Sequence, residues 1–208
     1  MSSTKHLDDL AQIRSIMERS KKFLSLSPWA AIMAGIYALA GAALAYMKIY
    51  FSPHIIYHEL EEGIDSPALF SLILIACGVF VLAAGTGLWL SYRKAAQSGE
   101  KLWSRSAIRL GINFLIPLMA GGSFVLLLFA RGFYDLLAPA TLIFYGLALL
   151  NAGNFTFSDI RSLGILEVVL GVLAGLFPGK GLMFWAFGFG ILHIIYGILM
   201  YRKYERST

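Results

Sequence analysis

The chain has 208 residues, of which 58% are hydrophobic and only 14% are charged, and its mean hydropathy is +0.72. Soluble domains carry about 25% charged residues, so the composition excludes a soluble globular protein and indicates a bundle of membrane helices. The formal net charge of +5 comes from Lys and Arg between apolar segments, a pattern typical of membrane topology rather than of nucleic-acid binding. The single cysteine, Cys77, excludes a disulfide framework and a thiolate metal site.

Residues 1–27 form a polar leader that is predicted to be an amphipathic helix. Asp8 and Asp9 come early in it and Lys21 and Lys22 come late, which suits the helix dipole. Such a helix lies on the membrane surface or against the bundle, and a helix that binds a protein partner is the alternative. The leader is too long and too acidic for a secretory signal peptide.

Six apolar segments follow the leader, each close to the ~20 residues that span the hydrocarbon of a bilayer. Ser27-Pro28 and Ser66-Pro67 start the first two, because proline suits the first turn of a helix. Pro117 predicts a kink inside the third. The predicted helices cover residues 28–46, 67–92, 106–130, 133–151, 160–177 and 182–201 of a bundle that extends over 28–204. The predicted fold is therefore all-α, a polytopic membrane protein with six transmembrane helices.

The distribution of Lys and Arg predicts that both termini are cytoplasmic, because inner segments are rich in these residues. With the N-terminus inside, the outer segments hold Lys48, Arg131 and Lys180. The inner segments hold Lys5, Arg14, Arg19, Lys21, Lys22, Arg93, Lys94, Lys101, Arg105, Arg109, Arg161, Arg202, Lys203 and Arg206. A basic belt among these inner residues is expected to contact anionic lipid headgroups, with a dedicated lipid or protein docking site as the alternative; it consists of Arg19, Lys21, Lys22, Arg93, Lys94, Lys101, Arg105 and Arg109.

Glycines seven residues apart recur in the second, fourth and sixth predicted helices. The pairs are Gly78 and Gly85, Gly146 and Gly153, and Gly190 and Gly197. Two helical turns separate the members of each pair, so each pair marks one face that allows close helix approach. The chain is then predicted to consist of three helical hairpins in the same orientation.

Two ionisable residues lie inside the last two apolar segments. Glu167 is about twelve residues before the centre of the turn at Phe177-Pro178-Gly179-Lys180-Gly181, and His193 is about thirteen after it, so at ~1.5 Å per residue they lie at similar depth. By the same arithmetic Tyr145 lies near them. Asn113 and Asn151 are placed closer to the cytoplasm, and Tyr37 and Thr86 could join this polar layer.

An ionisable residue inside a membrane indicates a functional site. One interpretation is a proton or small-ligand site in which His193 is the partner or relay of Glu167. The other is a hydrogen bond from Glu167 to His193 or Tyr145 that fixes helix packing.

A second cluster lies in the predicted outer segment. Ser52-Pro53 can start a short helix with His54 and His58 four residues apart and Glu62 one turn further. Two histidines at this spacing with a carboxylate can bind zinc, but an interfacial helix with a polar face explains them as well. No metal is favoured, and no cofactor is expected.

Motifs along most of the chain resemble those of a known family. The motifs are Tyr145-Gly-Leu-Ala-Leu-Leu-Asn151, Asp159-Ile-Arg161, Leu166-Glu167-Val-Val-Leu-Gly171, Phe177-Pro-Gly179, Gly188-Phe-Gly190, His193-Ile-Ile-Tyr196-Gly197 and the leader pattern from Ile13 to Ser27. They look like an uncharacterised family of six-helix bacterial inner-membrane proteins, which implies that location and no assigned activity. The hairpin around Pro178 is also similar to repeats in acid-resistance membrane proteins of enteric bacteria, which implies a stress-related role.

Three functional hypotheses follow. The first is a small non-enzymatic membrane protein that structures or senses within the bilayer, with a partner at its leader helix or a second copy of itself. The second is a small transporter or proton-coupled carrier that uses Glu167 and His193. The third is a membrane enzyme or metal protein that uses His54, His58 and Glu62. An open polar path to Glu167 would favour transport, and a dry bundle with Glu167 paired would favour the first.

Overall fold

The computed structural model describes residues 26–51, 67–97 and 104–205, and every regular element in them is helical. The helices are α2 (Pro28–Phe51), α4 (Pro67–Gln97), α5 (Arg105–Ala130), α6 (Leu137–Ala152), α7 (Ser158–Leu176), α8 (Gly181–Trp185) and α9 (His193–Tyr204). Short 3-10 turns, η2 (Tyr134–Leu136) and η3 (Gly153–Phe155), flank α6, and a π-helical segment, η4 (Ala186–Leu192), joins α8 to α9. The prediction of an all-α chain is confirmed for these residues.

Five helical segments are long and apolar enough to cross a membrane by length and composition. They are Pro28–Ile49, Phe70–Gln97, Arg105–Ala130, Tyr134–Phe155 and Gly181–Tyr204. The 19-residue helix α7 is not among them, and it carries Asp159, Arg161 and Glu167. The chain therefore has the helices of a membrane protein, and the sixth crossing stays a prediction.

The starts of these helices follow local sequence signals. Pro28 and Pro67 occupy the first positions of α2 and α4, as the Ser-Pro pairs indicate. Ser104 caps α5, because its hydroxyl accepts a hydrogen bond from the backbone N–H of Ala107 at 3.1 Å. Gly179 adopts a φ of +81° in the turn between α7 and α8, a conformation that glycine adopts without steric cost.

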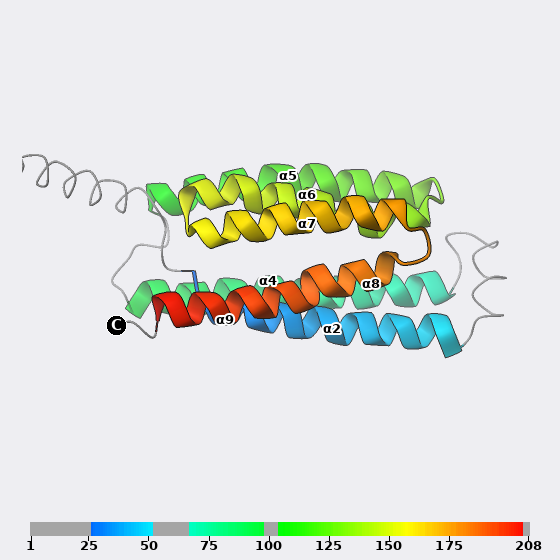
Figure 1. Ribbon diagram of the computed structural model, residues 1–208, viewed down its shortest axis with the longest axis horizontal. Coiled ribbons are helices and arrows are strands. Elements are labelled where there is room, and N and C mark those ends of the chain that lie inside the picture. Colours follow the sequence, from blue (N-terminus) through cyan, green and yellow to red (C-terminus); the bar gives the residue numbers. More distant parts are fainter. Residues whose placement is uncertain (1–25, 52–66, 98–103, 206–208) are drawn as a thin grey trace, which may run out of the picture.

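The helices lie in two layers (Figure 1): α5, α6 and α7 form one, and α2, α4 and the continuous α8–η4–α9 helix form the other. Within the layers α6 packs between α5 and α7, and α2 packs between α4 and α9. The layers meet where α7 and α6 contact α8 and where α7 contacts η4 and α9. Leu149, Leu163 and Leu192 form a buried cluster at this meeting point.

Glycines set the closest helix contacts, as expected where small residues let helix backbones approach in a membrane. A Cβ on Gly146 of α6 would lie 2.6 Å from the Gly164 carbonyl oxygen, and a Cβ on Gly164 of α7 would lie 2.7 Å from that of Gly146. Gly190 and Gly197 likewise pack against α2. A Cβ added at Gly190 would clash with Leu39, and one added at Gly197 would clash with Ile32. The close-approach prediction is therefore right for α6 and for the last helix.

For α4 the same prediction is wrong. A Cβ on Gly78 or on Gly85 would meet nothing within 4 Å. An adjacent face of α4 makes the contact with α2, where Val79 fits against Gly41 and the Thr86 hydroxyl lies 3.3 Å from the Tyr37 hydroxyl. Among the described residues the glycine face of α4 is therefore open, because α4 packs on α2 through the adjacent face.

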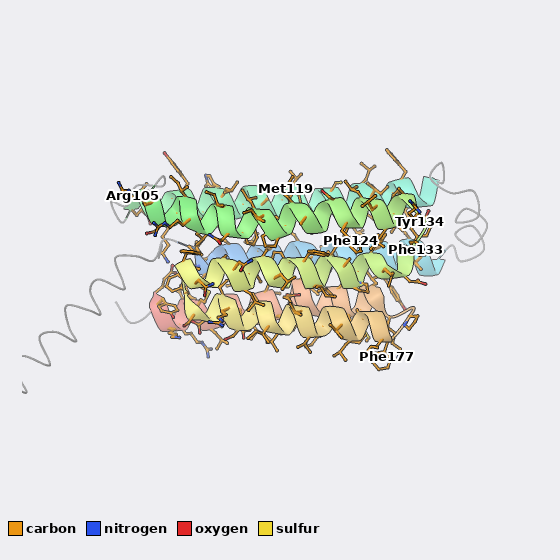
Figure 2. The ribbon with its side chains drawn as sticks, turned by 90° about the horizontal axis from the view of Figure 1, so that it is seen from above. Arg105, Met119, Phe124, Phe133, Tyr134 and Phe177 are labelled. Atoms are coloured by element: carbon orange, nitrogen blue, oxygen red, sulfur yellow. The ribbon has the colours of Figure 1, made fainter. Side chains whose placement is uncertain are left out.

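Charged side chains gather at one end of the bundle, which we call the basic end. Figure 2 marks this end by Arg105 and the opposite end by Phe133, Tyr134 and Phe177. The basic end holds Arg93, Lys94, Arg105, Arg109, Arg161, Arg202 and Lys203, and the opposite end holds Lys48, Arg131 and Lys180. The helix directions in the structure therefore place the described Lys and Arg residues in the asymmetric pattern that a positive-inside orientation requires.

Polar contacts connect elements at the basic end. Lys94 of α4 donates to the Glu205 carboxylate at 2.7 Å and to the Leu26 carbonyl at 3.1 Å. Lys203 and Tyr204 of α9 donate to the Asp159 carboxylate of α7 at 3.0 and 2.7 Å. The Lys94 contacts connect α4 to Leu26, before α2, and to Glu205, after α9. The Asp159 contacts connect α7 to α9 and therefore connect the two layers.

Candidate functional site

Glu167 lies in the middle of α7 and is completely buried, with 0% of its surface exposed. Gly188 of η4 provides the space for its carboxylate, because a Cβ at that position would lie 2.5 Å from Oε2 of Glu167 and 2.7 Å from the Leu142 side chain. A glycine opposite an acid is therefore what allows α7 and the last helix to approach at this depth.

The carboxylate of Glu167 receives no hydrogen bond from the described residues. Oε1 lies 3.4 Å from Nδ1 of His193, and both oxygens lack a hydrogen-bond partner there. In most proteins buried polar side chains are hydrogen-bonded, and an unpaired buried carboxylate costs on the order of several kcal/mol. The contact that remains is the 3.4 Å approach of His193, so the two side chains form a buried acid–base pair without a direct hydrogen bond.

His193, at the start of α9, is held through both ring nitrogens. Nδ1 lies 3.0 Å from the Gly188 carbonyl oxygen, and because a carbonyl only accepts, Nδ1 carries the hydrogen. Nε2 lies 2.8 Å from the Tyr145 hydroxyl. In a neutral ring that hydroxyl donates to Nε2, and in an imidazolium it accepts, so either charge state keeps both hydrogen bonds.

The π-helical segment η4 creates this arrangement. It ends immediately before His193, whose backbone N–H bonds to the Gly190 carbonyl. The Gly188 carbonyl instead accepts the His193 side chain. π-Helical turns occur mostly within α-helices and frequently at functional sites, since they redirect backbone groups.

Aromatic rings surround the polar groups. The ring centroid of Tyr145 lies 4.9 Å from that of Phe189 and 5.4 Å from that of His193, and Phe189 stacks on His193 at 6.0 Å. Two more rings extend this shell: the ring centroid of Phe114 lies 6.0 Å from that of Tyr145, and the ring centroid of Trp185 lies 5.0 Å from that of Phe189. Glu167 thus lies in apolar surroundings of low dielectric constant, where charge interactions are stronger than in water.

The other residues of the predicted polar layer lie elsewhere. The Asn113 side chain donates to the carbonyl of Arg109 in its own helix at 2.8 Å, and Asn151 is exposed near the end of α6. Tyr37 and Thr86 contact each other between α2 and α4. The structure therefore brings Glu167, His193 and Tyr145 together, while Asn113, Tyr37 and Thr86 make contacts elsewhere and Asn151 is exposed.

The other predicted sites cannot be placed. His54, His58 and Glu62 lie outside the described residues, and so do residues 1–25 of the leader. Among the residues that are described, no group of three or more His, Cys, Asp or Glu side chains could hold a metal ion.

Gly188 and Thr156 were not predicted as part of any site. Thr156, between η3 and α7, has 0% of its surface exposed. The only sequence signal for Gly188 is its place in Gly188-Phe-Gly190, because small residues opposite a membrane acid leave room for it. The π-helical segment itself has no sequence signal that we recognise.

Comparison of the chain with protein-family models, with curated proteins and with solved structures finds no match. The resemblances stated above therefore stay predictions, and the functional argument depends on the site alone.

Proposed function

We propose that this protein is a small, non-enzymatic, multi-pass protein of a bacterial inner membrane that senses protons through Glu167. In this proposal six helices, α7 included, cross the membrane, and both termini are cytoplasmic. The basic end then faces the cytoplasm, in agreement with the positive-inside rule.

The observation that carries the proposal is the buried, unbonded carboxylate of Glu167 beside a histidine that is bonded at both nitrogens. A carboxylate with a purely structural role is expected to have hydrogen bonds. The Glu167–His193 pair can instead hold one proton on either residue, and it can take up another to become a neutral acid beside an imidazolium. Tyr145 adjusts to either charge state of the ring by rotation of its hydroxyl.

Proton uptake would act on helix packing because the pair lies where α7 meets the last helix. The titratable groups at this contact are His193, from α9, and Tyr145, from α6. The sequences of α8 and η4 contain none, and α9 adds Tyr196 one turn further toward the basic end. A change in the net charge of the pair in apolar surroundings therefore changes the stability of the α7–α9 contact.

Transport is less well supported than sensing. Glu167 has no exposed surface, and the rings around it leave His193 only 4% exposed. A carrier needs a path by which its substrate reaches the site, and the described residues place aromatic and apolar side chains there instead.

The test is the pH dependence of melting in detergent for the full-length protein and for Glu167→Gln. The amide has the shape of the acid but cannot take up the proton, so the variant should stay folded and lose at least half of the pH-dependent change in melting temperature. Asp135→Asn, an exposed acid at the opposite end, is the matched control and should retain the wild-type change. Equal pH dependence in the wild type and in Glu167→Gln would reject the sensor.

A further inference from the structure

A groove of about 390 Å³ lies on the outside of the bundle, between α2 and α9. Its lining residues are Trp29, Ile32, Ile198, Tyr201 and Arg202. On α9, Tyr201 and Arg202 follow Ile198 by three and four positions, and on α2, Ile32 follows Trp29 by three. Residues at these spacings lie on one face of a helix, so each helix presents one face to the groove. The groove is separate from Glu167 and plays no part in the function proposed above.

Close packing at Gly197 holds α2 and α9 together beside the groove. A Cβ on Gly197 would lie 2.6 Å from the Ile32 side chain and 2.9 Å from the Pro28 carbonyl oxygen, so the two backbones nearly touch there. Trp29 and Tyr201 pack against each other edge to face, with their ring centroids 5.8 Å apart, and both line the groove. Both rings keep exposed surface, 49% for Trp29 and 38% for Tyr201.

Arg202 has no acidic partner among the described residues. The two carboxylates at the basic end are already engaged, Asp159 with Lys203 and Glu205 with Lys94. Arg202 is exposed and lines the groove. An arginine in this state can bind a phosphate through two parallel hydrogen bonds.

The polarity of the groove changes along the helix axis. Arg202, Trp29 and Tyr201 lie at the basic end, and Ile32 and Ile198 lie about one turn, roughly 5 Å, further into the bundle. Aromatic residues prefer the membrane interface. The order of cation, amphipathic rings and aliphatic side chains matches the order of phosphate, glycerol ester and acyl chain in one leaflet.

We propose that this groove binds one anionic phospholipid. Arg202 binds the phosphate, the exposed surfaces of the Trp29 and Tyr201 pair contact the glycerol esters, and one acyl chain lies along Ile32 and Ile198. Charge complementarity favours an anionic headgroup over a zwitterionic one, because a basic residue near the membrane surface attracts anionic lipids.

The experiment is native mass spectrometry of the full-length protein in detergent with either phosphatidylglycerol or phosphatidylcholine added. The wild type should retain one phosphatidylglycerol in preference to phosphatidylcholine, and Arg202→Gln should bind phosphatidylglycerol about fivefold more weakly. Arg161→Gln is the matched control, because it removes an exposed arginine of α7 at the same end; it should bind like the wild type. Glu167→Gln should also bind like the wild type, whatever it does to proton sensing.

Four outcomes would overturn the proposal. Equal retention of the two lipids by the wild type would show that the headgroup is not recognised. An equal loss in Arg161→Gln and Arg202→Gln would indicate general attraction to the basic end. Retention of inorganic phosphate with no retention of phosphatidylglycerol would indicate an anion site without an acyl chain. Ile198→Trp is the second variant: it fills the groove without altering charge, and unchanged lipid binding in that variant would also reject the site.

Discussion

The α6–α7 pair and helix α4 use the same glycine spacing with opposite results. In the span Tyr134–Phe155, which contains α6, 44% of the most apolar 18-residue stretch is buried. In the span Phe70–Gln97 of α4, none of the corresponding stretch is buried. Gly146 in α6 meets the backbone of α7, while Gly78 in α4 meets nothing within 4 Å. The difference arises because α7 supplies Gly164 directly opposite Gly146, and its Gly171 lets the backbone of α6 approach at Ile143 and Pro139. A glycine pair therefore marks a close contact only where the partner helix has a matching face.

The largest expected effect comes from replacing a packed glycine. Gly164→Leu should destabilise the protein by about 3 kcal/mol or more, because the backbone of α6 lies within 3 Å of the new Cβ and cannot move aside. Gly78→Leu is the matched control on α4. It should be neutral or slightly stabilising, since leucine is the better helix former by up to about 1 kcal/mol.

Unfolding in mixed micelles by increasing sodium dodecyl sulfate, followed by circular dichroism, measures both variants. Similar destabilisation by the two substitutions would mean that α4 is packed through its glycine face, against the open space around Gly78 in the structure.

A smaller effect is expected where a glycine faces a side chain instead of a backbone. Gly188→Ala places a methyl group 2.5 Å from Oε2 of Glu167, so it should cost about 1 to 3 kcal/mol. Glu167→Ala removes the atoms in the way, so the double variant should cost less than the sum of the two single ones. Additive costs in the same unfolding assay would show that Gly188 does not make space for the acid.

Much of the fold could be predicted from local sequence signals. Pro28 and Pro67 begin their helices because proline suits the first turn. Depth counted from the Pro178 turn places Glu167, His193 and Tyr145 at one level because an α-helix has a nearly constant rise. The structure brings these three residues together.

Long-range packing could not be predicted in the same way. Asn113 was counted in the layer by depth, but depth does not fix the side of the helix, and its side chain bonds to Arg109 in its own helix. The glycine pair of α4 has the right spacing and no partner face. The π-helical segment packs between α2 and α7, and no local pattern specifies that arrangement.

The smallest expected effect concerns the polar contact between the layers at the basic end. Asp159→Asn keeps an acceptor for the Tyr204 hydroxyl but loses the charge that pairs with Lys203. Because the pair is partly exposed, the expected loss is at most about 1 kcal/mol. Asp135→Asn, an exposed position at the opposite end, should have no measurable effect. A decrease of more than about 2 kcal/mol in the free energy of unfolding of Asp159→Asn would contradict this expectation. It would mean that the Asp159 contact stabilises the packing of the two layers far more than an exposed ion pair does.

The most direct test of proton binding by Glu167 is infrared difference spectroscopy of the lipid-reconstituted protein between acidic and alkaline buffer. A protonated carboxylic acid has a carbonyl-stretch band that a carboxylate lacks. Each of the 12 Asp and Glu side chains that takes up a proton in this range contributes to the band, so the test depends on the component that one substitution removes. We expect one component of the band to be lost in Glu167→Gln, to be kept in Glu205→Gln, and to shift in position in His193→Asn, because the imidazole lies 3.4 Å from the carboxylate. Identical difference spectra for the wild type and Glu167→Gln, over the pH range in which both stay folded, would show that Glu167 does not exchange a proton.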